Sequence, residues 1–227
     1  MLVYGALFLN ILRFFGFGAE AALDARYPAH WGRPVPREAA ASWEVLPQDA
    51  GPGEVILTKR NELGILSNFA ATPFTYRGKR YASIEGFWQF MKYPEGPDDP
   101  RATFPGIHWD YTRDEVAAMT GFEAKRAGDK AGENMRRIGI NWISFEGERI
   151  AYKDEGRQRH YQLIEDVTRE KVRAHTNVRD LLLSTGDLVL RPDHNQESDA
   201  TPAYRYFDIY MKIRGELQNE SIGTAKR

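Results

Sequence analysis

The chain has 227 residues, 42% of them hydrophobic, which is enough to bury one well-formed core. Its 31 basic and 32 acidic residues give a formal net charge of -1, so no overall field attracts nucleic acid or an anionic membrane. The absence of cysteine excludes disulfides, thiolate nucleophiles and cysteine-ligated metal centres, and it suits a cytoplasmic protein. The five histidines form no ligand motif, and we expect neither a metal nor a cofactor.

The first part of the chain is predicted to differ from the rest. Residues 1–18 are almost wholly apolar, but they lack the basic start of a signal peptide and are too short to span a membrane. They favour a terminal hydrophobic helix without stable membrane insertion. Residues 27–53 are rich in Pro, Gly and Ala, which is typical of a linker or of a segment packed over the main body. We expect three parts: a hydrophobic segment and linker at residues 1–53, a domain at 54–218 and a C-terminal tail at 219–227.

Strands are predicted only near the start of the domain. Residues 55–57 form a short apolar run, and residues 74–76 and 79–81 flank Arg77-Gly78 in the pattern of a hairpin. Ser83 is a plausible N-cap for the helix that follows. The hairpin therefore leads directly into a helix.

The rest of the domain is predicted to be helical. A capping box, Thr112 with Glu115, opens a helix that runs through Met119. Apolar residues recur at helical spacing further along, and Asn177 is placed to cap the third of these segments, which Gly186 closes. The segments are residues 122–135, 158–175, 178–184 and 206–217. The expected fold class is mainly α with a small β element.

The most informative helix starts after Ser83. Glu85, Gln89 and Lys92 lie at positions i, i+4 and i+7, so they share one side, while the opposite side is apolar. A carboxylate near a helix N-terminus stays ionised and can stabilise a developing positive charge, such as the oxocarbenium ion of glycosidic bond cleavage. Lys92 could pair with a phosphate or attack an anomeric carbon. The alternative is a solvated polar face, which is the commoner meaning of such a stripe.

Two other segments carry side chains suited to nucleotide chemistry. Asn68 offers a donor and an acceptor to a ribose or base edge, and Phe69 offers a stacking face. Lys125 and Arg126 precede Gly128, where a diphosphate could approach the backbone and be neutralised. The alternatives are a structural turn for the first segment and ordinary surface cations for the second.

Taken in order, these short motifs form a recognisable succession. They are Leu66-Ser67-Asn68-Phe69, Pro73-Phe74 with Tyr76, Ser83-x-Glu85-x3-Gln89-x2-Lys92, Ala124-Lys125-x2-Gly128, Lys171, and Leu181-Leu182-Leu183-Ser184-Thr185-Gly186-Asp187. The succession resembles the NADAR family, which includes the YbiA-like N-glycosidases. It covers roughly residues 55–217, and nothing before Gly53 is matched.

The resemblance implies a mainly α-helical YbiA-like domain with a small N-terminal β-hairpin. It also implies hydrolysis of the N-glycosidic bond of an ADP-ribosylated or phosphoribosylated base, either a small molecule or linked to nucleic acid. Examples are ADP-ribosyl-guanine and a riboflavin-pathway intermediate. The main alternative is a non-catalytic module that senses ADP-ribose or NAD, and a third class is an interaction protein whose hydrophobic N-terminus docks on a partner.

The resemblance also assigns catalytic roles. Glu85 is similar to the catalytic carboxylate, and either Lys92 or Lys171 to a nucleophilic or phosphate-contacting amine. Asp199 matches the family aspartate by its Asp-Ala context, with Asp193 as a rival. The predicted substrate-binding residues are Asn68, Phe69, Gln89, Lys125, Gly128 and Arg191.

The C-terminal part departs from the family pattern. Ala203-Tyr204-Arg205-Tyr206 stands where a Trp-Gly pair is expected. We therefore expect a divergent subfamily with a different base or leaving group.

Overall fold

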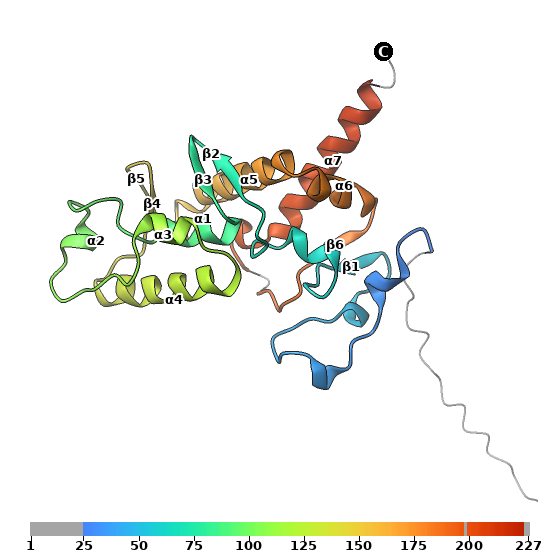
Figure 1. Ribbon diagram of the computed structural model, residues 1–227, viewed down its shortest axis with the longest axis horizontal. Coiled ribbons are helices and arrows are strands. Elements are labelled where there is room, and N and C mark those ends of the chain that lie inside the picture. The colour runs from blue at the N-terminus through green and yellow to red at the C-terminus, as the bar shows by residue number, and fades with distance from the viewer. Residues whose placement is uncertain (1–24, 198, 225–227) are drawn as a thin grey trace, which may run out of the picture.

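The computed structural model describes residues 25–197 and 199–224, with side chains as far as residue 220. The hydrophobic helix expected in residues 1–18 lies outside this part of the chain. The described molecule is mainly α, and its helices form an elongated body from which the last one projects (Figure 1). The helices are α1 (Ile84–Phe90), α2 (Pro100–Thr103), α3 (Arg113–Ala117), α4 (Gly121–Arg137), α5 (Arg157–Ala174), α6 (Thr176–Ser184) and α7 (Tyr206–Thr224).

The strands pair two by two. β1 (Glu54–Ile56) lies parallel to β6 (Val189–Arg191), β2 (Phe74–Tyr76) antiparallel to β3 (Lys79–Tyr81), and β4 (Ile143–Phe145) antiparallel to β5 (Glu148–Ile150). The turn between β2 and β3 stands where the hairpin was expected, with φ of 46° at Arg77 and 79° at Gly78. The expectation that strands end after this hairpin is wrong. Three-residue strands are too short to give a periodic hydrophobic pattern, so the sequence did not predict β4, β5 and β6.

Two of the expected helix starts are confirmed by side-chain caps. Ser83 Oγ accepts a hydrogen bond from the backbone N–H of Gly86 at 2.9 Å, and the capping box of Thr112 and Glu115 opens α3. Several boundaries were wrong, and α7 runs on to Thr224 instead of ending at residue 217. α1 ends at Phe90, so Lys92 lies in the turn after it, and α6 begins before Asn177 because His175 already has the extended conformation of an N-cap.

Helix α1 lies at the centre of the body, where α3, α4 and α5 pack around it (Figure 1). All of its residues from Ile84 to Phe90 are buried. Gly86 allows the closest approach, because a Cβ at this position would be 2.6 Å from the carbonyl oxygen of Met119. The fold thus holds α1, and the polar side chains on it, among its neighbours.

The described part of the N-terminal segment packs on the body beside β1. Trp31 is buried and its Nε1 donates to Glu62 at 2.6 Å. Arg60 donates to the carboxylate of Glu44 at 2.6 and 2.7 Å and to the carbonyl oxygen of Ala39 at 2.9 Å. Of the two readings of residues 27–53, a linker or a packed segment, the geometry matches the second.

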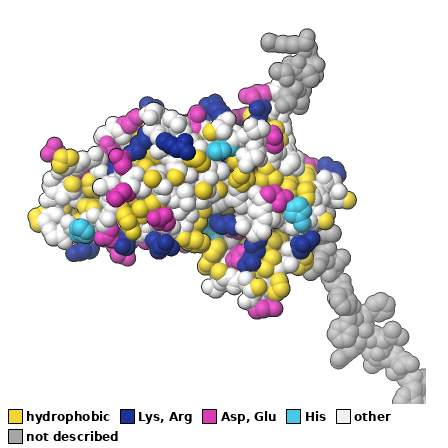
Figure 2. Space-filling model, viewed as in Figure 1, with side chains coloured by type: hydrophobic (Ala, Val, Ile, Leu, Met, Phe, Trp, Pro, Cys, Tyr) yellow, Lys and Arg dark blue, Asp and Glu magenta, His cyan; other side chains and the backbone are white. Residues whose placement is uncertain are grey.

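Charges of both signs are interspersed over the face seen in Figure 2. None of the described helices combines the length and the apolar character needed to cross a membrane.

Candidate functional site

The polar side of α1 is not solvated. Glu85 is only 7% exposed and Gln89 only 5%, so the alternative of a solvent-facing stripe is wrong. Gln89 Nε2 donates to Glu85 Oε1 at 2.7 Å, as the i, i+4 spacing permits. The Gln89 amide and the first turn of the helix stabilise the Glu85 carboxylate in this interior.

Burial and charge act against each other on Glu85. Burial raises the pKa of its carboxyl and outweighs the hydrogen bond from Gln89 and the charges of Lys92 and Lys125, which lower it. Burial lowers the pKa of Lys92 to about 8, and the charge of Glu85 opposes that shift. The charge of each group therefore favours the charged form of the other.

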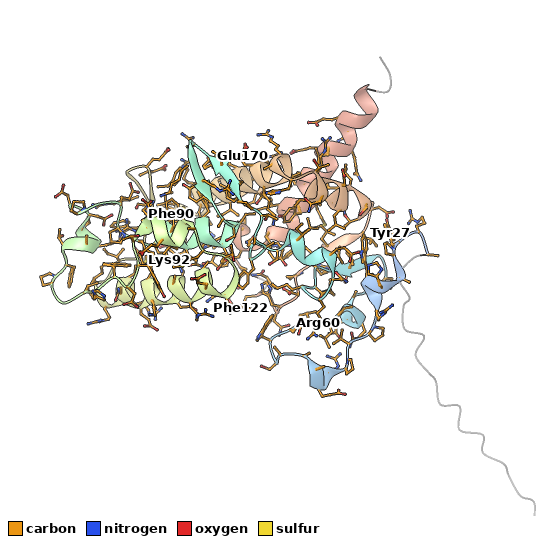
Figure 3. All side chains as sticks on the ribbon, in the orientation of Figure 1. Tyr27, Arg60, Phe90, Lys92, Phe122 and Glu170 are labelled. Atoms are coloured by element: carbon orange, nitrogen blue, oxygen red, sulfur yellow. The ribbon has the colours of Figure 1, made fainter. Side chains whose placement is uncertain are left out.

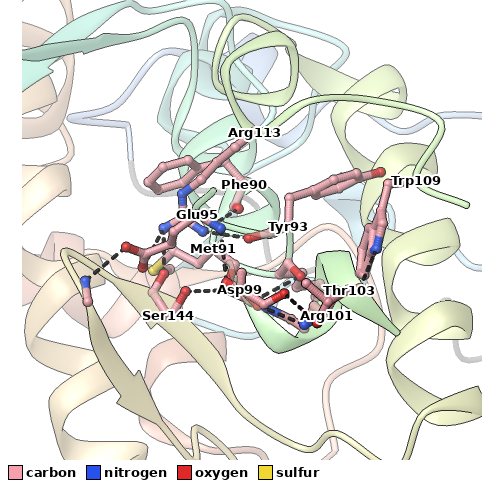
Figure 4. Close-up of polar contacts among 12 residues, drawn as sticks. Phe90, Met91, Tyr93, Glu95, Asp99, Arg101, Thr103, Trp109, Arg113 and Ser144 are labelled. Atoms are coloured by element: carbon pink, nitrogen blue, oxygen red, sulfur yellow. Dashed lines mark hydrogen bonds and ion pairs between the residues drawn. The ribbon is translucent and has the colours of Figure 1, made fainter. Parts of the chain in front are cut away.

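Lys92 follows the end of α1 and is held from both sides. Its Nζ donates to the carbonyl oxygen of Gly128 in α4 at 3.2 Å. Its backbone is fixed by Arg101 and Arg113, whose guanidinium groups bind four carbonyl oxygens at the end of α1 (Figure 4). These belong to Phe90, Met91, Lys92 and Tyr93. Such contacts satisfy carbonyls that have no partner within the helix, and they order the turn that carries Lys92.

Arg101 is itself fully buried and fully paired. Its guanidinium also donates to Asp99 at 2.6 Å and to the hydroxyl of Ser144 at 2.5 Å (Figure 4). The guanidinium keeps the Asp99 carboxyl ionised against burial, so the pKa of that carboxyl falls to about 2. This buried ion pair is a structural support for the turn of Lys92.

Gly128 leaves space in α4 for the side chain of Gln89. A Cβ on this residue would be only 1.8 Å from Gln89 Oε1. The glycine is needed because the Gln89 side chain occupies the space of a side chain at this position. The predicted role of Gly128 in substrate binding is untested, but its structural role is direct.

Asn68 joins the site through its backbone. Its carbonyl oxygen accepts from the backbone N–H of Glu85 at 2.9 Å. Two buried acceptors near Glu85, Asn68 Oδ1 and Gln89 Oε1, have no hydrogen-bond partner within the protein. Each needs a donor, and a sugar hydroxyl is one.

Lys171 lies beneath the loop of Asn68. It is fully buried, and its Nζ donates to the carbonyl oxygen of Ser67 at 2.9 Å. Burial lowers the pKa of Lys171 to about 7. Lys171 therefore hydrogen-bonds directly to the loop. Lys92, in contrast, interacts electrostatically with Glu85.

The predicted acids stand apart from this cluster. Asp199 is exposed. Asp193 is buried, where His194 and Lys59 outweigh the effect of burial and lower the pKa of its carboxyl. Arg191 lies in β6 and donates to Glu54 at 2.8 Å. Within the described residues, no hydrogen bond or ion pair joins any of these three side chains to Glu85.

The remaining predicted contacts lie around α4. Lys125 forms an i, i+4 ion pair with Asp129 on the surface, and its charge still lowers the pKa of Glu85. Phe69 packs edge-on against Phe122 with ring centroids 5.1 Å apart.

Sequence reasoning missed an aromatic wall beside Glu85. Trp88 lies between His160 and Tyr204, with ring centroids 4.5 and 4.9 Å away. Burial, followed by the charges of Tyr152 and Glu85, raises the pKa of Tyr204 to about 12, so this phenol stays neutral. Tyr204 stands where the family has Trp-Gly, and that departure was the only signal for it.

His160 is the least satisfied member of this wall. It is fully buried and neither ring nitrogen has a hydrogen-bond partner within the protein. Burial and the charge of Lys92 lower its pKa to about 3, so the imidazole is neutral.

Two cavities of the described structure lie away from Glu85. One of about 800 Å³ is lined by residues such as Tyr81, Phe90 and Arg113, and the other, of about 470 Å³, by residues such as Trp31 and Gln48. No group of three or more His, Asp or Glu side chains in the described part is arranged to hold a metal ion.

No protein-family model matches the chain, and no curated protein does either. Among solved structures, the NMR structure of the E. coli protein YbiA matches over 74% of this chain and 87% of that one, with 21% sequence identity and a TM-score of 0.46. The chain is thus similar to YbiA.

Proposed function

We propose that the protein hydrolyses the N-glycosidic bond between ribose carbon C1′ and a nitrogen base in an ADP-ribosylated or phosphoribosylated compound. The observation that carries the proposal is the buried carboxylate of Glu85, bonded to Gln89 and within the field of Lys92. Cleavage of such a bond builds positive charge on the ribose ring. A carboxylate in a water-poor site stabilises that charge more strongly than one in solvent.

The two unsatisfied amide oxygens suit a ribose. Asn68 Oδ1 and Gln89 Oε1 are acceptors, and the 2′- and 3′-hydroxyls of ribose are donors. Both amides are tied to Glu85, one through the backbone and one through its side chain. Ribose binding there would bring C1′ to the carboxylate.

Lys92 supplies the amine of the proposed mechanism. Its pKa of about 8 leaves a fraction of the side chain unprotonated near neutral pH. The amine attacks C1′, the bond from C1′ to the base breaks, and the base leaves with the electron pair and takes up a proton. The ring of this glycosylamine opens to an imine between C1′ and Lys92, and water hydrolyses the imine, which regenerates the amine and releases the free sugar. Lys171 positions the loop of Asn68 instead, since its side chain is fully buried, whereas that of Lys92 is partly exposed.

The first test is Glu85→Gln, with Glu170→Gln as a matched control at a partly exposed position of α5 (Figure 3). Each purified variant is incubated with ADP-ribosylated guanine in DNA and in RNA, with NAD and with a phosphoribosylated aminopyrimidine, and released base is measured by chromatography. Glu85→Gln should lose at least a hundredfold in kcat while retaining binding measured by calorimetry, and Glu170→Gln should match the wild type. Full activity of Glu85→Gln on every hydrolysed substrate contradicts the assignment. Binding of ADP-ribose without any product would favour the sensor.

The second test addresses Lys92. Borohydride added during turnover should trap a covalent adduct of the sugar on Lys92, and mass spectrometry of peptides locates it. Lys92→Arg keeps the positive charge but cannot form the adduct. A Lys92→Arg variant with wild-type kcat would show that this residue only contacts phosphate.

A further inference from the structure

Three aromatic rings from distant parts of the sequence meet near the start of α4. The rings of Trp43 and Phe122 have centroids 6.3 Å apart at an interplanar angle of 64°, and those of Phe69 and Phe122 are 5.1 Å apart at 84°. Trp43 is 44% exposed and Phe122 is 53% exposed. We call these three residues the aromatic surface. Exposed rings grouped in this way are typical of a binding site rather than of a core.

The aromatic surface is held in place. Glu44, next to Trp43, accepts two hydrogen bonds from Arg60, and the N–H of Val45 donates to the carbonyl oxygen of Asp193 at 2.9 Å. In Figure 3, Arg60 and Phe122 lie on the same side of the molecule, where the N-terminal segment passes the start of α4. Trp43 is therefore an exposed ring on an anchored backbone, which lowers the entropy that a ligand must remove.

The aromatic surface is also continuous with the candidate active site. Phe69 follows Asn68, whose carbonyl oxygen accepts from the N–H of Glu85. The carbonyl oxygen of Phe69 accepts from the N–H of Gly121 at 3.1 Å, and Gly121 precedes Phe122. One loop thus connects the carboxylate to two of the three rings.

Polar groups border the rings. Lys59 Nζ lies 5.3 Å from the ring centroid of Phe69 and 5.8 Å from that of Trp43, and its charge is balanced by Asp193. Asn68, whose Oδ1 is the acceptor proposed above for the ribose, is the residue before Phe69, so a base attached to that ribose would lie beside the rings. A planar ring with hydrogen-bonding edges suits this combination better than a purely apolar group.

We infer that the aromatic surface binds the nucleobase of the substrate by stacking on Trp43 and Phe122. This inference rests on the proposed function, because it needs a ribosylated base at Glu85. Trp43 belongs to the N-terminal segment, which precedes every motif of the family resemblance. The segment thereby adds a base-recognition element to the domain.

The test measures binding by calorimetry in a Glu85→Gln background, which prevents turnover. The ligands are guanosine 5′-monophosphate, adenosine 5′-monophosphate and ribose 5-phosphate. Trp43→Ala and Phe122→Ala should each weaken binding of at least one nucleotide roughly tenfold and leave ribose 5-phosphate unchanged, since stacking on one ring is worth about a factor of ten or more. Trp43→Phe should restore most of the affinity. Phe104→Ala is the matched control, because Phe104 is 45% exposed at the end of α2.

The outcomes separate the inference from the proposed function. Equal loss for the nucleotides and for ribose 5-phosphate, no loss in either variant, or no binding of any nucleotide overturns the stacking site. If nucleotides bind with the expected pattern but no substrate releases a base, the stacking site stands and hydrolysis fails. If base is released and Trp43→Ala has unchanged kcat/KM on every substrate, hydrolysis stands and the stacking site fails.

Discussion

Replacing Gly128 by alanine tests how α4 holds the polar cluster on α1. The added methyl group would lie 1.8 Å from Gln89 Oε1, 2.1 Å from its Cδ and 2.7 Å from its Cγ. These distances are far below van der Waals contact, and the three nearest atoms all belong to Gln89. The variant must therefore displace this side chain and break its hydrogen bond to Glu85.

The expected magnitude combines three effects. Losing a hydrogen bond to a charged group costs about 2 kcal/mol, and repacking an overfilled interior costs about 2 kcal/mol more. Alanine in a helix interior returns about 1 kcal/mol relative to glycine. The Gly128→Ala variant should therefore lose about 3 kcal/mol in its free energy of unfolding.

Urea denaturation followed by circular dichroism measures this loss. Gly132→Ala is the control in the same helix, because a Cβ there meets nothing closer than the end of Arg136 at 3.6 Å, and it should gain about 1 kcal/mol. In a Gln89→Ala background the clash is absent, so adding Gly128→Ala should stabilise the protein by about 1 kcal/mol. A loss of about 3 kcal/mol in both backgrounds would refute the reasoning.

Three further predictions follow from the same geometry. Gly86→Ala should lose roughly 1–3 kcal/mol in urea denaturation, because its Cβ would meet the backbone oxygen of Met119 at 2.6 Å and backbone cannot rotate away. Lys171 has a pKa of about 7 in the folded state, against 10.5 ordinarily. Between these pH values the unfolded chain binds more protons than the folded one, so the contribution of Lys171 to the free energy of unfolding rises with pH. The difference in unfolding free energy between wild type and Lys171→Met should therefore rise from pH 7 to pH 9 by up to about 1.4 kcal/mol per unit, and a flat difference would contradict it. Arg101→Met should lower the free energy of unfolding by about 3–5 kcal/mol, because it leaves the carboxylate of Asp99 buried without its partner. An equal loss in Asp99→Asn would support the pairing.

Much of the secondary structure could be predicted because its signals are local. The Ser83 cap, the capping box of Thr112 and the helical spacing of apolar residues each act within a few positions of the chain. The β1–β6 pair could not be predicted, because its two short strands lie at opposite ends of the domain. Pairing over such a separation depends on the packing of everything between them.

The same division runs through the candidate site. Helical geometry alone places Glu85 and Gln89 on one side of a helix, so their spacing in the chain was enough to predict it. The burial of this side could not be predicted, because it depends on the close approach of α4 at Gly128. The tertiary structure also places Trp43 beside Phe122, through ion pairs and backbone contacts that join residues far apart in the chain. Local spacing fixes which side chains point together, but only long-range packing sets whether water, a core or a ligand meets them.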